Sequence, residues 1–342
     1  MVGSATALVP LSTPALWLTG LARGLLFAGL AMALGGLAGR GLSRQYKGVR
    51  PGPLPGPWAL RGSLGGLAAS AALLITALIG PGLATELARP APPGLRSGGT
   101  AEIAAVEVAC FALAAILLRL RRSGLGALML SGVVVAEGIR SHPEGVIPVA
   151  GAFVTYCHVF PAVLWAGMLL YALRAAIAWR ADPVAAHGII RLYATAAGWL
   201  FSIVIVTGVI SALVLVPLGS LLTTAYGRFL IAKAVLVAIA AGLAFAGRMW
   251  LRRHPEASAG PALATKLEMV ALAAVLAITG ILTVIAPPAR RNAGGSAPAP
   301  AQAFQLYRVR SGPAAAVPAG RIGPMAGARN VVSGHLLLKQ RQ

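Results

Sequence analysis

The chain has 342 residues, of which 58% are hydrophobic and only 11% are charged. Soluble domains carry about 25% charged residues, so this composition excludes an ordinary soluble protein and indicates a membrane protein. The formal net charge of +21 would suit a nucleic-acid-binding protein. However, most of the basic residues lie in short loops between apolar segments, where they set membrane topology, and we expect no nucleic-acid partner.

The apolar runs are continuous rather than alternating, so they predict an all-α, polytopic membrane helix bundle with about eight transmembrane helices. In chain order the predicted spans are residues 20–38, 63–83, 103–118, 125–139, 147–173, 192–216, 229–249 and 267–286. We divide the chain into an N-terminal segment (1–19), a first four-helix half (20–140), a second four-helix half (141–287) and a basic tail (288–342). The Ala, Pro and Gly content of the tail predicts disorder.

Lysine and arginine are distributed unevenly among the loops. They are concentrated after the first, third, fifth and seventh spans, as in the run Arg119, Arg121 and Arg122. The positive-inside rule places those loops in the cytoplasm. We therefore expect a multi-pass plasma-membrane protein with both termini extracytoplasmic. The basic tail then lies outside, which the rule tolerates because long segments translocate largely regardless of charge.

A histidine lies near the middle of an uncharged stretch that is long enough to cross a membrane. Residues 145–173 contain no Asp, Glu, Lys or Arg, and their centre reads Thr155-Tyr156-Cys157-His158-Val159-Phe160-Pro161. At about 1.5 Å per residue, His158 lies about 16 Å from Ile147, close to the midplane of a ~30 Å hydrocarbon layer. An ionisable group there is costly and suggests a proton relay, a metal ligand or a haem ligand. The neighbouring Cys157 favours a soft or borderline metal such as copper.

Two structural details would help this pair to bind a metal. Pro161 removes the backbone hydrogen bond to the carbonyl of Cys157, so we expect a kink that leaves this oxygen free. His142 lies just outside the fourth span and is expected to line an outer vestibule with His158. Each side chain also has an ordinary explanation, since a membrane cysteine packs as a small hydrophobe and a histidine can bond to a neighbouring helix.

Other polar residues in the apolar segments are secondary candidates. Met168 shares a helical face with Cys157 but lies about 16 Å further along, too far to bind the same ion. Cys110 lies in the third span at a similar depth. Among the charged residues, Glu137 and Lys233 both lie near the outer boundary, and we expect them to pair because opposite charges buried in lipid should meet. The sequence contains no P-loop, HExxH, GxSxG or CxxC motif, so we do not expect an enzyme.

The second half of the chain resembles the copper resistance protein D (CopD) family. His158 followed by Leu164-Trp165-Ala166-Gly167 is similar to the family's helix with a histidine and a W-x-G motif. The segment Thr224-Ala225-Tyr226-Gly227-Arg228-Phe229-Leu230-Ile231-Ala232-Lys233 resembles its T-x-Y-G-R-x-L-x-x-K entry into the next helix. Leu267-Glu268 and the ending Ala286-Pro287-Pro288 also fit. Ser141-His142-Pro143 departs from the family's G-H-A.

The resemblance implies a plasma-membrane protein that moves copper, from outside inward, with His158, His142 and Cys157 as metal ligands. Acidic residues in the outer half would attract the cation. A separate CopC-like extracytoplasmic protein would be the copper donor. Two other functions remain open from the residues alone: a haem-binding electron-transfer protein, which needs a second deep histidine, and a membrane assembly factor without a transported ion.

Overall fold

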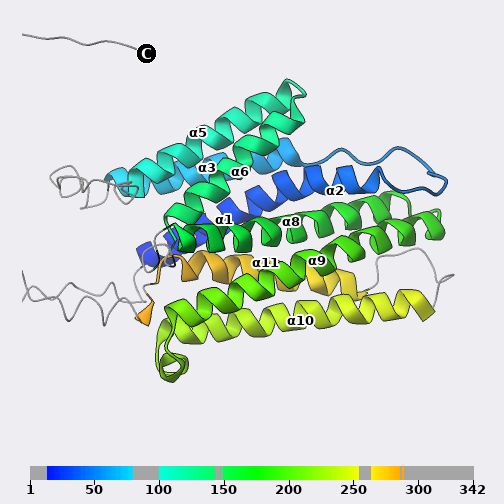
Figure 1. Cartoon of the computed structure of the whole chain (residues 1–342). Helices are drawn as coiled ribbons and strands as arrows, with labels where there is room; N and C mark the ends of the chain where they lie inside the picture. Colours follow the sequence, from blue (N-terminus) through cyan, green and yellow to red (C-terminus); the bar gives the residue numbers. More distant parts are fainter. Residues whose placement is uncertain are drawn as a thin grey trace, which may run out of the picture. The chain divides into compact units, whose positions relative to one another are not determined.

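The computed structural model describes residues 14–79, 100–141, 143, 147, 149–253, 263–285 and 287–288. Within these ranges the chain is mostly long helices and contains no strand (Figure 1). The helices are α1 (Pro14–Leu30), α2 (Gly36–Ser43), α3 (Ala59–Ile79), α5 (Thr100–Arg119), α6 (Ser123–Ile139), α8 (Ala150–Ala178), α9 (Pro183–Leu215), α10 (Ala225–Arg253) and α11 (Leu263–Leu282). A π-helical turn, η1 (Ala31–Gly35), joins α1 to α2, and a short 3₁₀ helix, η3 (Leu218–Ser220), precedes α10.

The predicted fold class is confirmed. Six helices in the described part are long and apolar enough to cross a membrane, the first of them running continuously through α1, η1 and α2. A seventh, α6, is shorter at 17 residues. The 20-residue α11 overlaps the last predicted span, so each of the eight predicted spans overlaps a helix, and six of these helices meet the length and hydropathy of a membrane span. The predicted disordered tail and His142 lie outside the described residues.

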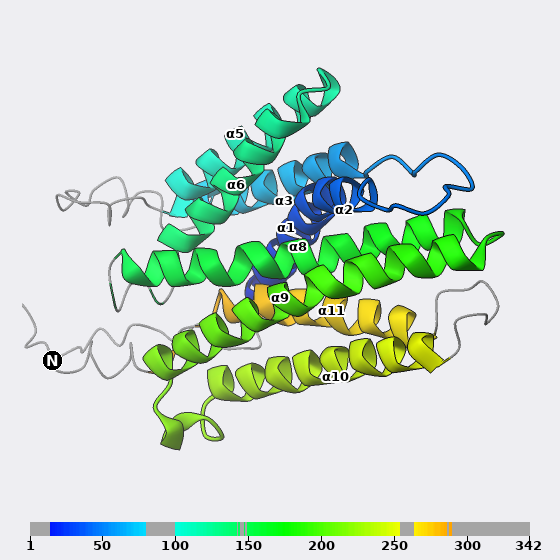
Figure 2. The same ribbon diagram turned by 45° about the vertical axis from the view of Figure 1, so that its right-hand side comes forward.

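Glycine lets the helices approach closely in the centre of the bundle. A Cβ atom on Gly167 of α8 would lie 1.8 Å from the carbonyl oxygen of Ala31 and 2.7 Å from the Cα atom of Gly35. No side chain fits in that space, so the η1 backbone lies directly against α8. Figure 2 shows the α1–α2 helix crossing behind α8. Small residues at such a crossing are the usual means by which membrane helices pack.

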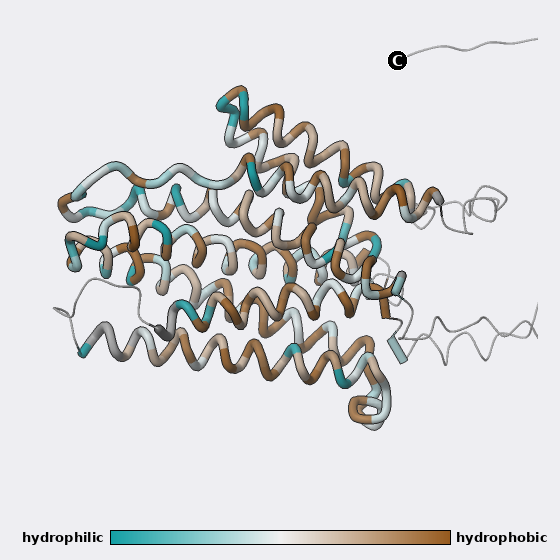
Figure 3. Tube along the Cα trace, turned by 180° about the vertical axis from the view of Figure 1, so that it is seen from behind, coloured by the Kyte–Doolittle hydropathy of each residue, from teal (hydrophilic) through white to brown (hydrophobic). Residues whose placement is uncertain are grey.

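At one end of the bundle, the polar loop between α2 and α3 contacts side chains of α8. The hydroxyl of Tyr171 donates to the carbonyl of Pro55 at 2.8 Å, and the guanidinium of Arg174 lies 3.7 Å from the ring centroid of Trp58. Figure 3 shows hydrophilic residues gathered at this end and apolar residues along the helices. The positive-inside rule predicts that this end is cytoplasmic. The opposite end is called the Arg140 end below, after the residue that follows α6.

The α8–α9 hairpin positions the main candidate residue. The Asp182 carboxylate accepts a hydrogen bond from the backbone N–H of Ala185 at 3.0 Å, and Pro183 occupies the first turn of α9. Both residue types favour a helix start, which explains why α9 begins well before the predicted residue 192. As a result α9 is 33 residues long and runs beside α8 along the bundle (Figure 1).

Candidate functional site

His158 lies between α8 and α9, about two turns (~12 Å) from the start of α8 at the Arg140 end. The helix begins at Ala150 and continues beyond Leu173 to Ala178, and the predicted depth of His158 in the membrane stays a prediction. Thr207 of α9 and Lys233 of α10 lie about the same distance from that end of their own helices. The three residues therefore share one level of the bundle.

Two acceptors on α9 hold the imidazole ring. The Nδ1 atom of His158 lies 3.1 Å from the carbonyl oxygen of Val204 and 3.1 Å from the hydroxyl oxygen of Thr207. A carbonyl oxygen can only accept, so Nδ1 must carry a proton. The Thr207 hydroxyl donates its own hydrogen to the carbonyl of Ile203 at 2.6 Å, which leaves its oxygen lone pairs for the histidine.

The proton on Nδ1 determines what the other nitrogen can do. In the neutral ring only one nitrogen is protonated, so Nε2 is left with a free lone pair. An Nδ1–H bond to a backbone carbonyl is the usual arrangement behind a metal-binding Nε2, because it fixes both the tautomer and the orientation of the ring. The contacts of His158 with α9 are therefore compatible with a ligand role for Nε2, which stays a prediction.

Gly208 makes room for this ring. A Cβ atom at position 208 would lie 3.1 Å from Cε1 of His158 and 3.5 Å from its Nδ1 atom. An added Cβ would require the imidazole ring to shift by a few tenths of an ångström. Glycine at position 208 therefore favours the observed contact of the ring with α9.

Lys233 is the charged residue whose electrostatic field reaches His158. The predicted pair of Lys233 with Glu137 is wrong. Glu137 instead binds Arg140, which follows it by one helical turn, and its carboxylate lies 3.6 Å from Arg23 of α1. Among the residues that the structure describes, no carboxylate forms an ion pair with Lys233.

The remaining ligand candidates do not gather around His158. Cys157 is a free, partly buried thiol, and its role as a ligand remains a prediction. Cys110 faces Gly132 of α6, where an added Cβ would lie 3.2 Å from its sulfur. Met168 is 6% exposed and packs in the hydrophobic core. Within the described ranges no three His, Cys, Asp or Glu side chains come together to hold a metal.

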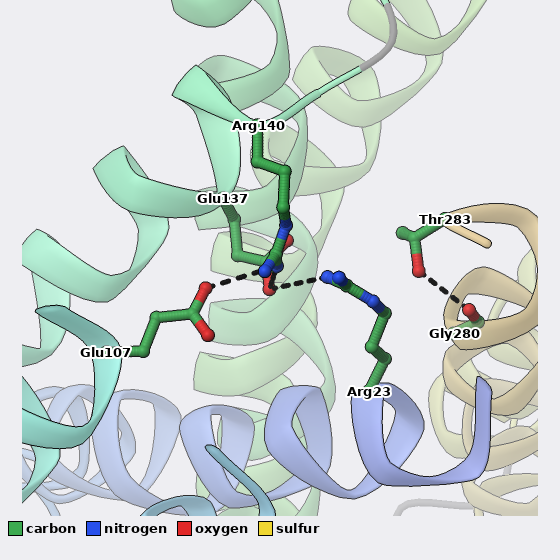
Figure 4. Close-up of polar contacts among 6 residues, drawn as sticks. All are labelled: Arg23, Glu107, Glu137, Arg140, Gly280 and Thr283. Atoms are coloured by element: carbon green, nitrogen blue, oxygen red, sulfur yellow. Dashed lines mark hydrogen bonds and ion pairs between the residues drawn. The ribbon is translucent and has the colours of Figure 1, made fainter. Parts of the chain in front are cut away.

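A second polar centre lies in the first half of the chain, at the Arg140 end. Arg23 of α1, Glu107 of α5, Glu137 of α6 and Arg140 form a cluster with two positive and two negative charges, called the ion quartet below (Figure 4). The expectation that outer acids attract a cation therefore fails for Glu107 and Glu137, because arginines already neutralise them.

Comparison with known proteins relates the second half of the chain to one family. Residues 187–286 match the family model of copper resistance protein D (CopD). The match confirms the resemblance across most of α9 and all of α10 and α11, and relates this multi-pass membrane protein to copper resistance. No curated protein and no solved structure matches the chain.

The segment that matches the CopD family contains only part of the candidate site. Val204, Thr207, Gly208 and Lys233 lie inside the matched segment, whereas His158 precedes it on α8. Sequence reasoning found His158 from the cost of a histidine in lipid, but it missed Thr207 and Gly208. A threonine or a glycine in an apolar helix is common, so only the packing of α8 on α9 reveals their role.

Proposed function

We propose that this protein carries copper across the plasma membrane, inward, and that His158 is the intramembrane residue over which the ion passes. The observation that carries the proposal is the Nδ1–H contact of His158 with Val204 and Thr207, which leaves Nε2 as a ligand. Imidazole nitrogen is a good copper ligand, and α9, which carries both acceptors of the ring, lies mostly within the segment that matches the CopD family.

The surroundings of His158 favour passage of an ion over its storage. Described residues supply no set of three metal-binding side chains, and the charge that acts on His158 is the ammonium group of Lys233, at the same level of the bundle. A cation beside the ring opposes tight binding of a second cation. Transport needs binding that is strong enough for entry and weak enough for release, which one histidine beside a lysine provides.

His142 and Cys157 complete the proposed route. His142 would receive copper at the outer surface from a separate CopC-like protein, and Cys157 would offer a thiolate or thiol one residue before His158. Both residue types bind copper, so they are suitable ligands on either side of such a passage.

Copper accumulation in cells tests this function. Cells that express the wild-type protein are expected to accumulate more copper than cells with an empty vector, and His158→Gln should remove the difference. Trp199→Phe, at a lipid-exposed position on α9, is the matched control and should behave as wild type. Normal accumulation with His158→Gln would count against the proposal, and a haem absorption band in the purified protein would favour electron transfer instead.

A further inference from the structure

The ion quartet lies in the part of the chain that the CopD match does not cover. Glu107 is fully buried, Glu137 is 5% exposed and Arg23 is 8% exposed. Figure 4 shows both carboxylates turned toward the guanidinium group of Arg140 and only Glu137 turned toward Arg23. Four charges buried in an apolar bundle are costly, so their arrangement calls for a reason beyond packing.

The two carboxylates are not equally compensated. The Nη2 atom of Arg140 forms an ion pair with each of them. It lies 3.1 Å from Oε1 of Glu107, and it also contacts Oε1 of Glu137. Glu137 has a second counter-ion in Arg23 at 3.6 Å, whereas Glu107 has Arg140 alone. Both carboxylates are buried, so water does not compensate the difference. Two carboxylates that share one guanidinium nitrogen repel each other, and a single proton relieves that repulsion.

The other residues packed against Glu107 supply no competing charge. Its helix, α5, packs against α3 and α6. The titratable residue of α3 is Arg61, at the opposite end of the bundle, and that of α6 is Glu137. On α5 itself, Cys110 is the neighbouring titratable group. Burial therefore acts on the charge of Glu107 first, and the neighbouring charges that act on it are those of Glu137, Arg140 and Arg23.

We propose that Glu107 is a proton-exchange site inside the membrane, loaded from the Arg140 end of the bundle. Its carboxylate takes a proton from water at that end and returns it to the same water. When Glu107 is protonated, Arg140 forms an ion pair with Glu137 only. The net charge of the ion quartet then changes from zero to +1. Arg140 is partly exposed, with 12% of its side chain accessible, so the quartet reaches the edge of the bundle. This proposal does not rest on copper transport.

Infrared difference spectroscopy of the full-length protein in lipid vesicles tests the proposal. The pH is lowered from about 9 to about 6, a range in which ordinary glutamates, with pKa near 4.3, stay ionised. We expect the C=O stretching band of a protonated carboxyl group to appear in the wild-type protein. Glu107→Gln should lack the band, and Glu102→Gln, which alters an exposed glutamate of the same helix, should keep it.

Two results would overturn the proposal: no pH-dependent carboxyl band in the wild-type protein, or the same band in Glu107→Gln. Glutamine has the shape of a protonated glutamate, so this variant should fold, which circular dichroism can verify. If it does not fold, dicyclohexylcarbodiimide, which reacts with protonated carboxyl groups in apolar surroundings, replaces it on the wild-type protein. Labelling of Glu107 at pH 6, located by mass spectrometry, supports the proposal, and labelling of Glu137 instead contradicts it.

Discussion

Gly208→Ala tests whether the contact between His158 and α9 matters for function. The new Cβ atom would lie 3.1 Å from Cε1 of His158. Carbon atoms pack best at about 3.5–4.0 Å, so the ring must move away from α9 by roughly 0.4 Å or more. Both 3.1 Å contacts of Nδ1, with Val204 and Thr207, then lengthen toward the limit of hydrogen bonding.

The size of the effect follows from the one hydrogen on Nδ1, which the two acceptors share. A side-chain hydrogen bond between membrane helices contributes about 0.6 kcal/mol on average and about 1.7 kcal/mol at most, so the loss of this shared bond costs about 1.2 kcal/mol. This corresponds to about sevenfold weaker interaction of copper with a correctly oriented ring. We expect the initial rate of copper uptake at low copper to fall by about this factor.

The assay is initial copper uptake by vesicles that contain equal amounts of purified protein. Gly242→Ala on α10 is the matched control, because a Cβ at that position meets no atom within 4 Å. Alanine favours helix over glycine at both positions, so neither variant should unfold. If Gly208→Ala and Gly242→Ala transport copper equally well, the ring does not need its contact with α9 and the reasoning about Nε2 is refuted.

Three further variants probe the site and the packing. Thr207→Val should slow copper uptake about threefold, because one acceptor of the His158 ring is lost. Thr207→Ser keeps the hydroxyl group and should transport copper as wild type does. Equal uptake rates for the two variants would show that the Thr207 hydroxyl is not needed. Gly167→Ala should lower the free energy of unfolding, measured by thermal unfolding in detergent, by about 3 kcal/mol, because the new Cβ would lie 1.8 Å from a backbone atom. Gly65→Ala is the control, because a Cβ at that position meets open space and should leave the unfolding free energy unchanged. Similar melting of the two variants would contradict the close packing of η1 on α8. Arg140→Gln should cost about 3–5 kcal/mol in a denaturant titration, since it leaves two carboxylates with one arginine, and a loss no larger than that of the exposed Arg191→Gln would contradict the ion quartet.

The helices could be predicted from the sequence because membrane spans are continuous apolar runs. The start of α9 was predicted late, at residue 192, because hydropathy falls over the preceding polar turn. Asp182 and Pro183 carried the missing signal, since an N-cap acid followed by proline marks a helix start. Local capping chemistry therefore locates this boundary better than hydropathy does.

The partners of the buried charges were harder to predict. The sequence placed Glu137 and Lys233 at similar depths, which is not enough to show that they meet. Arg140 lies one helical turn after Glu137, and residues at that spacing face each other, so the correct partner was available from local geometry. The contacts with Arg23 and Glu107 depend on how α1 and α5 pack against α6, which depth along the helices does not determine.

Copper uptake by vesicles that contain only the purified protein tests the central claim most directly. The account predicts saturable uptake by the wild-type protein and uptake at the level of protein-free vesicles for His158→Gln. Folding of the variant is checked by its helical circular dichroism and its thermal unfolding. Equal copper uptake by wild type and a folded His158→Gln protein would contradict the account, because copper would then cross the membrane without the His158 imidazole as a ligand.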